Sequence, residues 1–355
     1  MIKIEQLIAT DSTQMRALLR HQDELIPYES FCVEDKLLVS AIVFWQHWLA
    51  CRFHLAPAVY IAKENGVLLG LISVSSYGKA NTCWKINHLV VHPSHRGRGI
   101  AQKLLQYVFA LFGSQGVSHF VTEISCRNSP ALSLLAGLGF RRVARVVHYQ
   151  MPSAINKEDT EQEESNIFRW ACSEDKELLC QLFQDSLPSD LRTVYAYQAN
   201  DFVIKPITNE LIANNPKQLS RLRCWYWVAH NKDRNVLTAA IKVTSHRPGD
   251  YHFEFVIHPG WQHMADEAVN FVKEALNCLH IKGMIVTKIY DYQAPIGQAL
   301  EAARWESQGE FLLLVKEHWL RAKKRSLKLD TTVTLPGIAK PAINMPFKMP
   351  ESPSG

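Results

Sequence analysis

The sequence lacks paired cysteines and a secretory signal. Its eight cysteines are scattered and form no Cys-x-x-Cys pair, which argues against zinc ribbons and thioredoxin-like redox sites. A disulfide framework is not expected in a chain of 355 residues whose start, "MIKIEQLIATDS", has neither the basic segment nor the long apolar region of a signal peptide. We therefore expect a cytoplasmic protein with free thiols.

Long hydrophobic runs and a strong charge imbalance are also missing. The apolar stretch Leu37–Cys51 contains Gln46 and His47 and is shorter than the roughly 20 residues of a membrane span, which favours a buried helix. The net charge of +5 is too diffuse to indicate nucleic acid, and the basic run at 321–328 is typical of a solvated helix end. We predict no membrane segment and no nucleic-acid partner, while the oligomeric state stays open.

Strand and helix patterns alternate along the first half, which indicates a mixed α/β (α+β) fold. Two apolar runs flank the turn residues Glu64-Asn65-Gly66, as in a β-hairpin, and Asp11 or Ser12 is the expected N-cap of the first helix. The expected elements are a helix at 11–26, a hairpin at 58–78, strands at 83–92, 118–126 and 141–151, and helices at 99–112 and 129–140.

The second half repeats this order. A strand, a His-Pro pair, a short loop and a helix occur at 89–109 and again at 255–275, so we infer an internal duplication in which each copy is a full domain. The expected elements are a helix at 173–187, strands at 224–231, 236–246, 251–261 and 282–290, and helices at 264–279 and 295–305.

Composition marks the boundaries of the two copies. Residues 153–166 are polar and acidic, as in a linker, and the last 26 residues carry five prolines, as in a disordered tail. We therefore expect domains at 1–152 and 167–329, joined by the linker 153–166 and followed by the tail 330–355.

The stretch "HPSHRGRGIAQKLL", residues 92–105, places glycines and arginines together where a helix begins. Gly97 and Gly99 permit a close backbone approach and a positive φ. The N–H groups of the first helical turn carry partial positive charge, to which Arg96 and Arg98 add full charges. The pattern predicts an anion site suited to a pyrophosphate, although it is neither a Walker P-loop nor the full GxGxxG dinucleotide motif.

The letters "RGRGIA" at 96–101 match Arg/Gln-x-x-Gly-x-Gly/Ala, the acetyl-CoA signature of the GNAT superfamily of N-acetyltransferases. The strand "INHLVVHP" precedes them as in that family, and "NSPALSLLAGLGF" at 128–140 is similar to its later Asn…Ala…Leu-Gly-Phe segment. Residues 1–151 thus resemble a GNAT domain. With the duplication, the resemblance implies two tandem GNAT-like domains, each a mixed, mostly antiparallel sheet flanked by helices.

The resemblance implies how acetyl-CoA, the cosubstrate, is bound. The strand of Leu89, Val90 and Val91 is expected to splay from that of Glu123, so that the pantetheine arm binds the open edge and N–H groups near Val90 and Val91 polarise the thioester carbonyl. Asn128 either contacts the cofactor, as in the family, or caps the helix that follows. The diphosphate would be held by Arg96, Gly97, Arg98, Gly99, Ile100, Ala101 and Gln102.

The resemblance also implies the chemistry, in which a base deprotonates the alkylammonium acceptor before its amine attacks the thioester. Glu123 occupies the family's base position, with a solvated strand-edge carboxylate as the alternative, and His88 is a second candidate. Leu135 replaces the family's proton-donating tyrosine, so Tyr149, Tyr107 or a water is expected to act instead. No metal is predicted, because no carboxylate or cysteine lies at ligand spacing from the histidines.

In the second copy, "QHMADE" at 262–267 replaces "RGRGIA", and Asp266 and Glu267 would repel a diphosphate. We therefore expect one acetyl-CoA site per chain. The expected function is acetyl-CoA-dependent N-acetylation of an amine on a small molecule, a protein N-terminus or a lysine. The alternative, favoured by Leu135, is a non-catalytic acetyl-CoA-binding or partner-binding protein.

Overall fold

The computed structural model describes residues 2–19, 58–77, 82–152, 167–204, 224–247, 250–278 and 283–318. Met1–Trp319 form one compact unit that includes both copies. Several predictions lie outside the described residues: the end of the first helix, the apolar stretch Leu37–Cys51, the linker 153–166, the basic run 321–328 and the tail 330–355.

The first half contains the strands and helices that its sequence patterns predict. Asn65 and Gly66 have φ angles of 52° and 81°, the left-handed pair that a tight two-residue hairpin requires. Its elements are β1 (Lys3–Gln6), α1 (Ser12–Leu19), β2 (Ala58–Glu64), β3 (Val67–Tyr77), β4 (Cys83–Val91), α4 (Ile100–Gly113), β5 (His119–Ser125), α5 (Ser129–Gly137) and β6 (Arg141–Gln150), with short 3-10 turns at Ala9–Asp11 and Pro93–His95.

The second half follows the same order and adds elements that the sequence analysis did not predict, namely β7, α7 and β12. Its elements are β7 (Phe168–Trp170), α6 (Lys176–Ser186), α7 (Ser189–Tyr195), β8 (Cys224–Asn231), β9 (Val236–Arg247), β10 (Asp250–Ile257), α9 (Ala265–Cys278), β11 (Ile285–Tyr290), α10 (Ala294–Ala302) and β12 (Glu306–Glu317). Short 3-10 turns lie at Ser173–Asp175, Ala199–Asp201, Pro259–Met264 and Asp291–Gln293.

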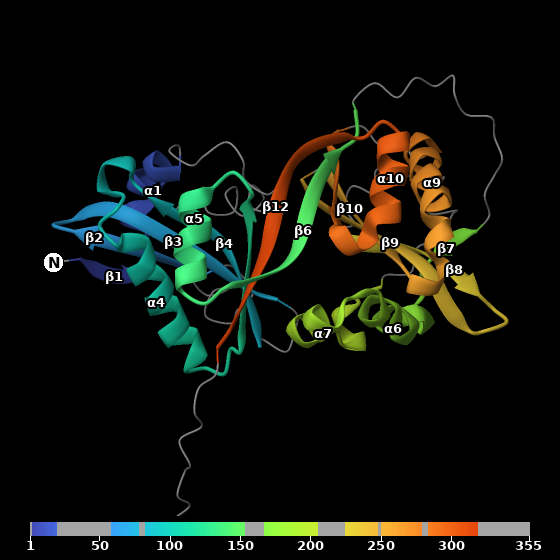
Figure 1. The fold of residues 1–355 in the computed structure, drawn as a ribbon, viewed down its shortest axis with the longest axis horizontal. Helices are drawn as coiled ribbons and strands as arrows, with labels where there is room; N and C mark the ends of the chain where they lie inside the picture. Colours follow the sequence, from blue (N-terminus) through green and yellow to red (C-terminus); the bar gives the residue numbers. More distant parts are fainter. Residues whose placement is uncertain are drawn as a thin grey trace, which may run out of the picture. The chain divides into compact units, whose positions relative to one another are not determined.

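All these strands join one 12-stranded sheet in the order β1-β2-β3-β4-β5-β12-β6-β11-β10-β9-β8-β7. The two halves exchange their last strands: β12, from the second half, pairs with β5, whereas β6, from the first, pairs with β11. In Figure 1, β6 and β12 run side by side where the two halves meet, as their antiparallel register requires. Neither copy therefore completes its sheet with its own chain segment.

Local details repeat between the halves and confirm the duplicated fold. In both, the histidine of the His-Pro pair caps a 3-10 turn, since the Nδ1 atoms of His92 and His258 accept bonds from the N–H groups of Ser94 and Gly260 at 3.4 and 3.0 Å. Only β4–β5 and β10–β11 pair in parallel among the described strands, and all other pairs are antiparallel. The structure therefore confirms a mixed, mostly antiparallel sheet with helices.

Helices cover both faces of this sheet. On one face of β5, Phe120 packs with residues of α4 and α5, and on the other Val121 packs with Leu191 of α7, as the alternation of a strand requires. The helices α9 and α10 of the second half cover a separate core that contains Phe253 of β10. Among the described helices, none is long and apolar enough to cross a membrane.

Candidate functional site

The strands β4 and β5 separate halfway along their length. Their parallel pairing runs from Cys83↔His119 to Lys85↔Val121 and stops there, although β4 continues to Val91 and β5 to Ser125. The hydroxyl of Thr122 closes the paired part by donating to the carbonyl of Ile86 at 3.1 Å. Beyond it, the β5-facing edge of Leu89, Val90 and Val91 has no strand partner among the described residues. The structure thus contains the splayed edge that the sequence analysis expected.

A β-bulge lies where the two strands separate. Ser73 is paired with His88 and Val74 with Ile86, so Asn87 is an extra residue in β4. In a regular strand, two residues three positions apart point to opposite faces. Because of the extra residue, Ile86 and Leu89 both face the core under α4. The bulge turns the backbone of β4 just before the open edge. The matching stretch of β10 pairs with β9 without such a break.

The glycine–arginine loop has the geometry of an anion site. Gly97 and Gly99 have φ angles of 77° and 72°, and a Cβ at either position would meet no atom within 4 Å. Gly99 is the N-cap of α4 and provides no side-chain cap, so the N–H groups of the first turn face outward. These donors and the adjacent arginines fit a diphosphate group.

Contacts within the loop hold its arginines in place. Arg98 donates to Glu64 Oε2 at 2.8 Å and lies 3.1 Å from His95 Nδ1, while Arg96 Nε donates to the carbonyl of Val91 at 3.4 Å. The hydrogen bond from Arg98 holds the pKa of Glu64 below its ordinary value. An incoming anion would therefore compete with Glu64 for the Arg98 guanidinium.

Glu123 lies on β5 at the separation and is surrounded by cationic and imidazole groups. Its side chain is only 3% exposed, and its carboxylate lies 3.2 Å from Lys288 Nζ, 3.7 Å from Lys85 Nζ and 3.5 Å from His148 Nε2. The alternative of a solvated strand-edge carboxylate is therefore wrong. Burial of this carboxylate is compatible with its charge because cations lie beside it.

The partners of Glu123 come from three other strands, and the sequence analysis missed them. Lys85 is on β4, His148 on β6 and Lys288 on β11. In the sheet, β12 and β6 lie between β5 and β11. Lys288 Nζ nevertheless lies within hydrogen-bonding distance of Glu123 Oε1. The available signal was a single lysine inside an otherwise apolar strand, as in "CWKIN" and "IVTKIY", because a buried lysine needs an anionic partner.

Of the other candidate residues, His88 lies near the separation and Tyr149 does not. His88 is 2% exposed and is paired with Ser73 next to the bulge. Tyr149 packs in the core under α9 and α10, and its hydroxyl donates to Glu301 at 2.9 Å. Neighbouring residues of a strand point to opposite faces, so Tyr149 points away from Glu123 while His148 approaches it. This corrects the expectation that Tyr149 supplies a proton here, and burial also raises its pKa to about 12.

The other three residues that the sequence analysis discussed, Asn128, Leu135 and Tyr107, each pack within the first half. Asn128 caps α5, since its side-chain oxygen accepts a bond from the Ala131 N–H at 3.1 Å, which confirms the capping alternative. Leu135 is 2% exposed in the core under α4 and α5. Tyr107 is 36% exposed on α4 and packs against Tyr60 at a ring distance of 5.4 Å.

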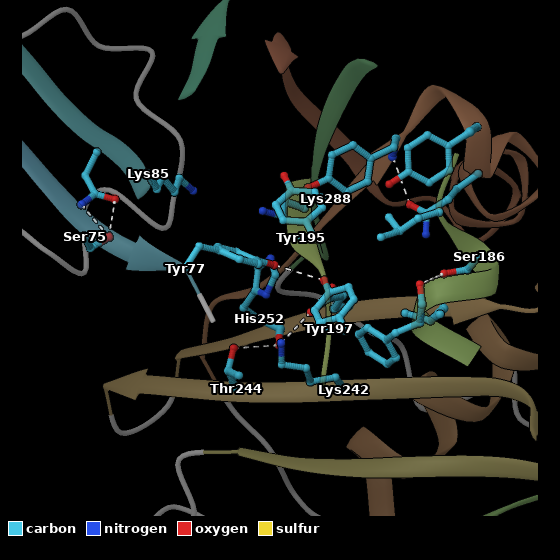
Figure 2. A pocket seen from close by; sticks show the side chains of 18 residues that line it. Ser75, Tyr77, Lys85, Ser186, Tyr195, Tyr197, Lys242, Thr244, His252 and Lys288 are labelled. Atoms are coloured by element: carbon cyan, nitrogen blue, oxygen red, sulfur yellow. Dashed lines mark hydrogen bonds and ion pairs between the residues drawn. The ribbon is translucent and has the colours of Figure 1, made fainter. Parts of the chain in front are cut away.

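A cavity of about 300 Å³ lies beside the separation, between strands of the two halves (Figure 2). Ser75, Tyr77, Lys85 and Asn87 of β3 and β4 line one side, and residues of α6, α7, β9, β10 and β11 line the others. A smaller pocket that includes Glu123 shares Tyr77, Lys85, Tyr195, Lys288 and Tyr290 with it. The Glu123 carboxylate thus lines a small pocket that shares its walls with the larger cavity.

The corresponding region of the second half carries an ion pair and lacks the glycine–arginine loop. The pairing of β10 with β11 ends at Phe253↔Thr287, and the Thr287 hydroxyl donates to the Phe253 carbonyl at 2.7 Å, as in the first half. Next to it, Lys242 donates to Glu254 at 2.8 Å. The loop before α9 has no glycine–arginine pattern, and the first turn carries Asp266 and Glu267. These residues do not fit a diphosphate.

Comparison with known proteins agrees with this geometry. The sequence profile of the Acetyltransferase (GNAT) family matches residues 19–140. An L-amino acid N-acyltransferase of Escherichia coli is 32% identical over 115 residues, which are 31% of this chain and 62% of that protein. The chain is matched over only 38% to 62% of the length of its curated relatives.

Two solved structures share the fold over most of both chains. A GCN5-related N-acetyltransferase from Sphaerobacter thermophilus superposes with a TM-score of 0.58 at 12% identity, over 90% of this chain and 96% of its own. A tandem GNAT protein from the clavulanic acid biosynthesis pathway gives 0.52 at 14% identity, over 90% and 100%. At these identities the likeness concerns the fold. Together with the matched family profile, it shows that the chain contains a GNAT acetyltransferase domain in its first half, within a fold of two tandem GNAT-like copies.

Proposed function

We propose that the protein is an acetyl-CoA-dependent N-acetyltransferase that moves an acetyl group directly to a primary amine, and that the first copy performs the reaction. The observation that supports this most is the coincidence of three features on β4 and β5. The strands separate at Lys85 and Val121, an uncapped helix with the glycine–arginine loop follows β4, and Glu123 is buried on the facing strand.

Residues of the first copy would bind the cosubstrate along this edge. The loop from Arg96 to Gln102 would hold the diphosphate through the first-turn N–H groups of α4. The open edge of Leu89–Val91 would receive the pantetheine arm as an added strand. Acetyl-CoA supplies an acetyl thioester, whose carbonyl oxygen the N–H groups near Val90 and Val91 would polarise.

Glu123 would accept the proton of the acceptor ammonium, directly or through a water. The neighbouring ammonium groups of Lys85 and Lys288 favour its ionised form, which is the form that takes a proton. The deprotonated nitrogen forms a bond to the acetyl carbon, the carbon–sulfur bond breaks, the nitrogen loses its second proton, and the departing thiolate takes up a proton. Leu135 carries no hydroxyl, Tyr149 faces another core, and Tyr107 of α4 packs against Tyr60, so we assign the transfer of this last proton to the thiolate to water.

The second candidate function is binding of acetyl-CoA without catalysis, either to sense it or to contact a partner. The buried Leu135 favours this function, because it stands where the resemblance implies a proton donor. The cytoplasmic location expected from the sequence stays a prediction.

Two measurements on the full chain test the proposal. Calorimetric titration with acetyl-CoA is expected to give one site per chain, and a stoichiometry of two would contradict the loss of the second site. Release of the CoA thiol is then followed with a broad panel of primary amines, and acetylated products are identified by mass. Tight binding of acetyl-CoA with no transfer to any amine would favour the binding protein over the enzyme.

A further inference from the structure

The cavity beside Glu123 is built by both halves of the chain, and five tyrosines line it. Its volume of about 300 Å³ is at the lower end of the range for small-molecule sites. Figure 2 shows the hydroxyls of Tyr77, from β3, and Tyr197, from the second half, joined by a hydrogen bond with oxygen atoms 3.1 Å apart. The lining tyrosines are Tyr77, Tyr195, Tyr197, Tyr290 and Tyr292.

The smaller pocket that contains Glu123 has room for one small polar group. Its volume is about 10 Å³, which is close to the space that one water molecule needs, and an ammonium group is of similar size. Tyr290 lines both spaces, whereas Tyr197 and Tyr292 line the larger one. A ligand whose amine lies at Glu123 would therefore have to place the rest of its body in the larger cavity.

The lysines of these walls are paired with carboxylates. Lys242 donates to Glu254 at 2.8 Å, and Lys288 donates to Glu123 at 3.2 Å. Lys85 Nζ lies 3.7 Å from the same oxygen of Glu123, within ion-pair distance. Because each of these cations has an anion beside it, the walls call for no charged group on a ligand other than the amine that reacts.

The tyrosines are neutral and present ring faces to the cavity. Burial raises the pKa of Tyr77 and of Tyr195 well above the ordinary value for a phenol, and it raises the pKa of Tyr197 to about 12. These hydroxyls therefore keep their protons at neutral pH. Neutral phenol rings stack on other rings and attract cations, as the 5.8 Å distance from Lys288 Nζ to the centre of the Tyr290 ring illustrates.

Stacked rings form the wall that the second half contributes. Tyr290 and Tyr292 are stacked at a ring distance of 5.2 Å and an angle of 9°. Tyr195 and Tyr197 are stacked at 6.2 Å and 26°. Rings in such stacks offer flat faces, against which a flat aromatic ring packs better than a puckered aliphatic ring of the same size. The second half thus supplies a surface suited to an aromatic body.

We propose that this cavity is the acceptor site and that the acceptor is a small primary amine with an aromatic ring. The amine lies in the small pocket at Glu123, and the ring lies in the larger cavity against Tyr197 and Tyr292. The proposal rests on the N-acetyltransferase function proposed above. It gives the second copy, which lacks the glycine–arginine loop, a part in selecting the acceptor of the first.

A matched pair of amines tests the aromatic ring. With acetyl-CoA and the full chain, kcat/KM is measured for 2-phenylethylamine and for 2-cyclohexylethylamine, which share a carbon skeleton and differ in the flatness of the ring. The aromatic amine is expected to be preferred about two- to tenfold, through its packing on the tyrosine rings. The cyclohexyl amine is the more apolar of the two, so burial of apolar surface alone favours it. Equal or better turnover of the cyclohexyl amine would overturn the proposal while leaving the N-acetyltransferase function intact.

Substitutions in the stacked wall test the position of the ring. Tyr292→Leu removes one ring and Tyr292→Phe keeps it without the hydroxyl, so the preference for the aromatic amine should fall toward one in the first variant and stay near that of the wild type in the second. Tyr197→Leu is a second test of the same wall, with the same expectation as Tyr292→Leu. The matched control is Tyr251→Leu, which removes a ring that packs against Trp225 in the core under α9 and α10 and should retain the preference. An unchanged preference in the folded leucine variants of the wall, or an equal loss in the control, would overturn the assignment of the ring to this wall.

A binding measurement separates this proposal from the proposed function. The products N-acetyl-2-phenylethylamine and N-acetyl-2-cyclohexylethylamine are titrated by calorimetry into the wild type and into Tyr292→Leu. Tighter binding of the aromatic product, lost in Tyr292→Leu, would support an aromatic ligand in this cavity even if no amine were turned over. If transfer occurs but both products bind alike, the aromatic acceptor is wrong and the N-acetyltransferase stands.

Discussion

Replacing Glu123 by glutamine tests the proposed base with little change in shape. Loss of a general base costs about 10²–10⁴-fold in rate, so kcat is expected to fall by this factor while the affinity for acetyl-CoA stays near that of the wild type. The reason for the second expectation is position, since Glu123 lies on β5 and the diphosphate loop follows β4. Steady-state CoA release and calorimetry measure the two quantities.

The proposed base also predicts how the activity of Glu123→Gln depends on pH. An acceptor amine with an ordinary pKa of about 10.4 is mostly protonated at neutral pH. Its neutral fraction increases about tenfold for each unit by which the pH rises toward that pKa. The activity of Glu123→Gln should therefore recover toward the wild type as the pH rises. Full activity of Glu123→Gln at neutral pH would refute Glu123 as the base. Full activity of both Glu123→Gln and His88→Gln would refute the mechanism.

The substitution also disturbs the charges around Glu123, which requires a control. It leaves Lys85 and Lys288, whose side chains are 13% and 11% exposed, facing a neutral amide, and breaking a buried ion pair costs on the order of 3 kcal/mol. Asp175→Asn breaks another pair with a buried carboxylate, Arg169–Asp175 at 2.7 Å, in the second half. It is expected to lower stability but to retain kcat per folded molecule. Equal losses of kcat in the two variants would mean that unfolding explains the effect.

Three further predictions concern single residues. Arg98→Glu should weaken acetyl-CoA binding by about 1.5–3 kcal/mol, or roughly 10- to 150-fold in Kd, and an unchanged Kd by calorimetry would mean that the loop binds something else. Arg304 has a φ of 61° where the first copy has Gly139, so Arg304→Gly should raise the unfolding free energy in urea by about 1 kcal/mol. Burial alone would raise the pKa of Asp175, but hydrogen bonds from Arg169 and from a backbone N–H hold it below its ordinary value. Ionised Asp175 therefore contributes to the free energy of unfolding at pH values above its ordinary pKa, and this contribution is lost as the pH falls through its lower pKa in the folded state. Asp175→Asn should accordingly make the free energy of unfolding depend less on pH in the acid range.

Local signals in the sequence were enough to locate the hairpin, the anion loop and the repeat. Asn65-Gly66 and the glycines of 97–99 need left-handed backbone angles, and both appear as expected, because residues next to each other in the chain determine such angles. The cap by Asn128 follows from the same local logic. What these signals share is a physical cause that acts within a few residues.

The exchanged strands and the charges around Glu123 had no such signal. The pairing of β12 with β5 joins residues 311–317 to residues 119–125, and nothing in either segment specifies the other as its partner. Lys288 is 165 residues from Glu123 in the chain, and the two meet only in a sheet built from both copies. The environment of Glu123, the proposed base, is therefore a property of the assembled sheet, whereas the glycine–arginine loop is a property of one segment.

The exchange explains why a copy without an anion loop is still needed by the other. Without β12, the edge of β5 that carries Glu123 would lose its neighbour, and Leu313 and Val315 would no longer cover Val121 and Ala144 in the shared core. The second copy also contributes Lys288, which is held opposite His148 by the pairing of β11 with β6. A second copy without the glycine–arginine loop could change freely at the matching loop but not at these strands. The fold of the second copy is thus tied to the surroundings of Glu123 in the first through hydrogen-bonded register and buried charge.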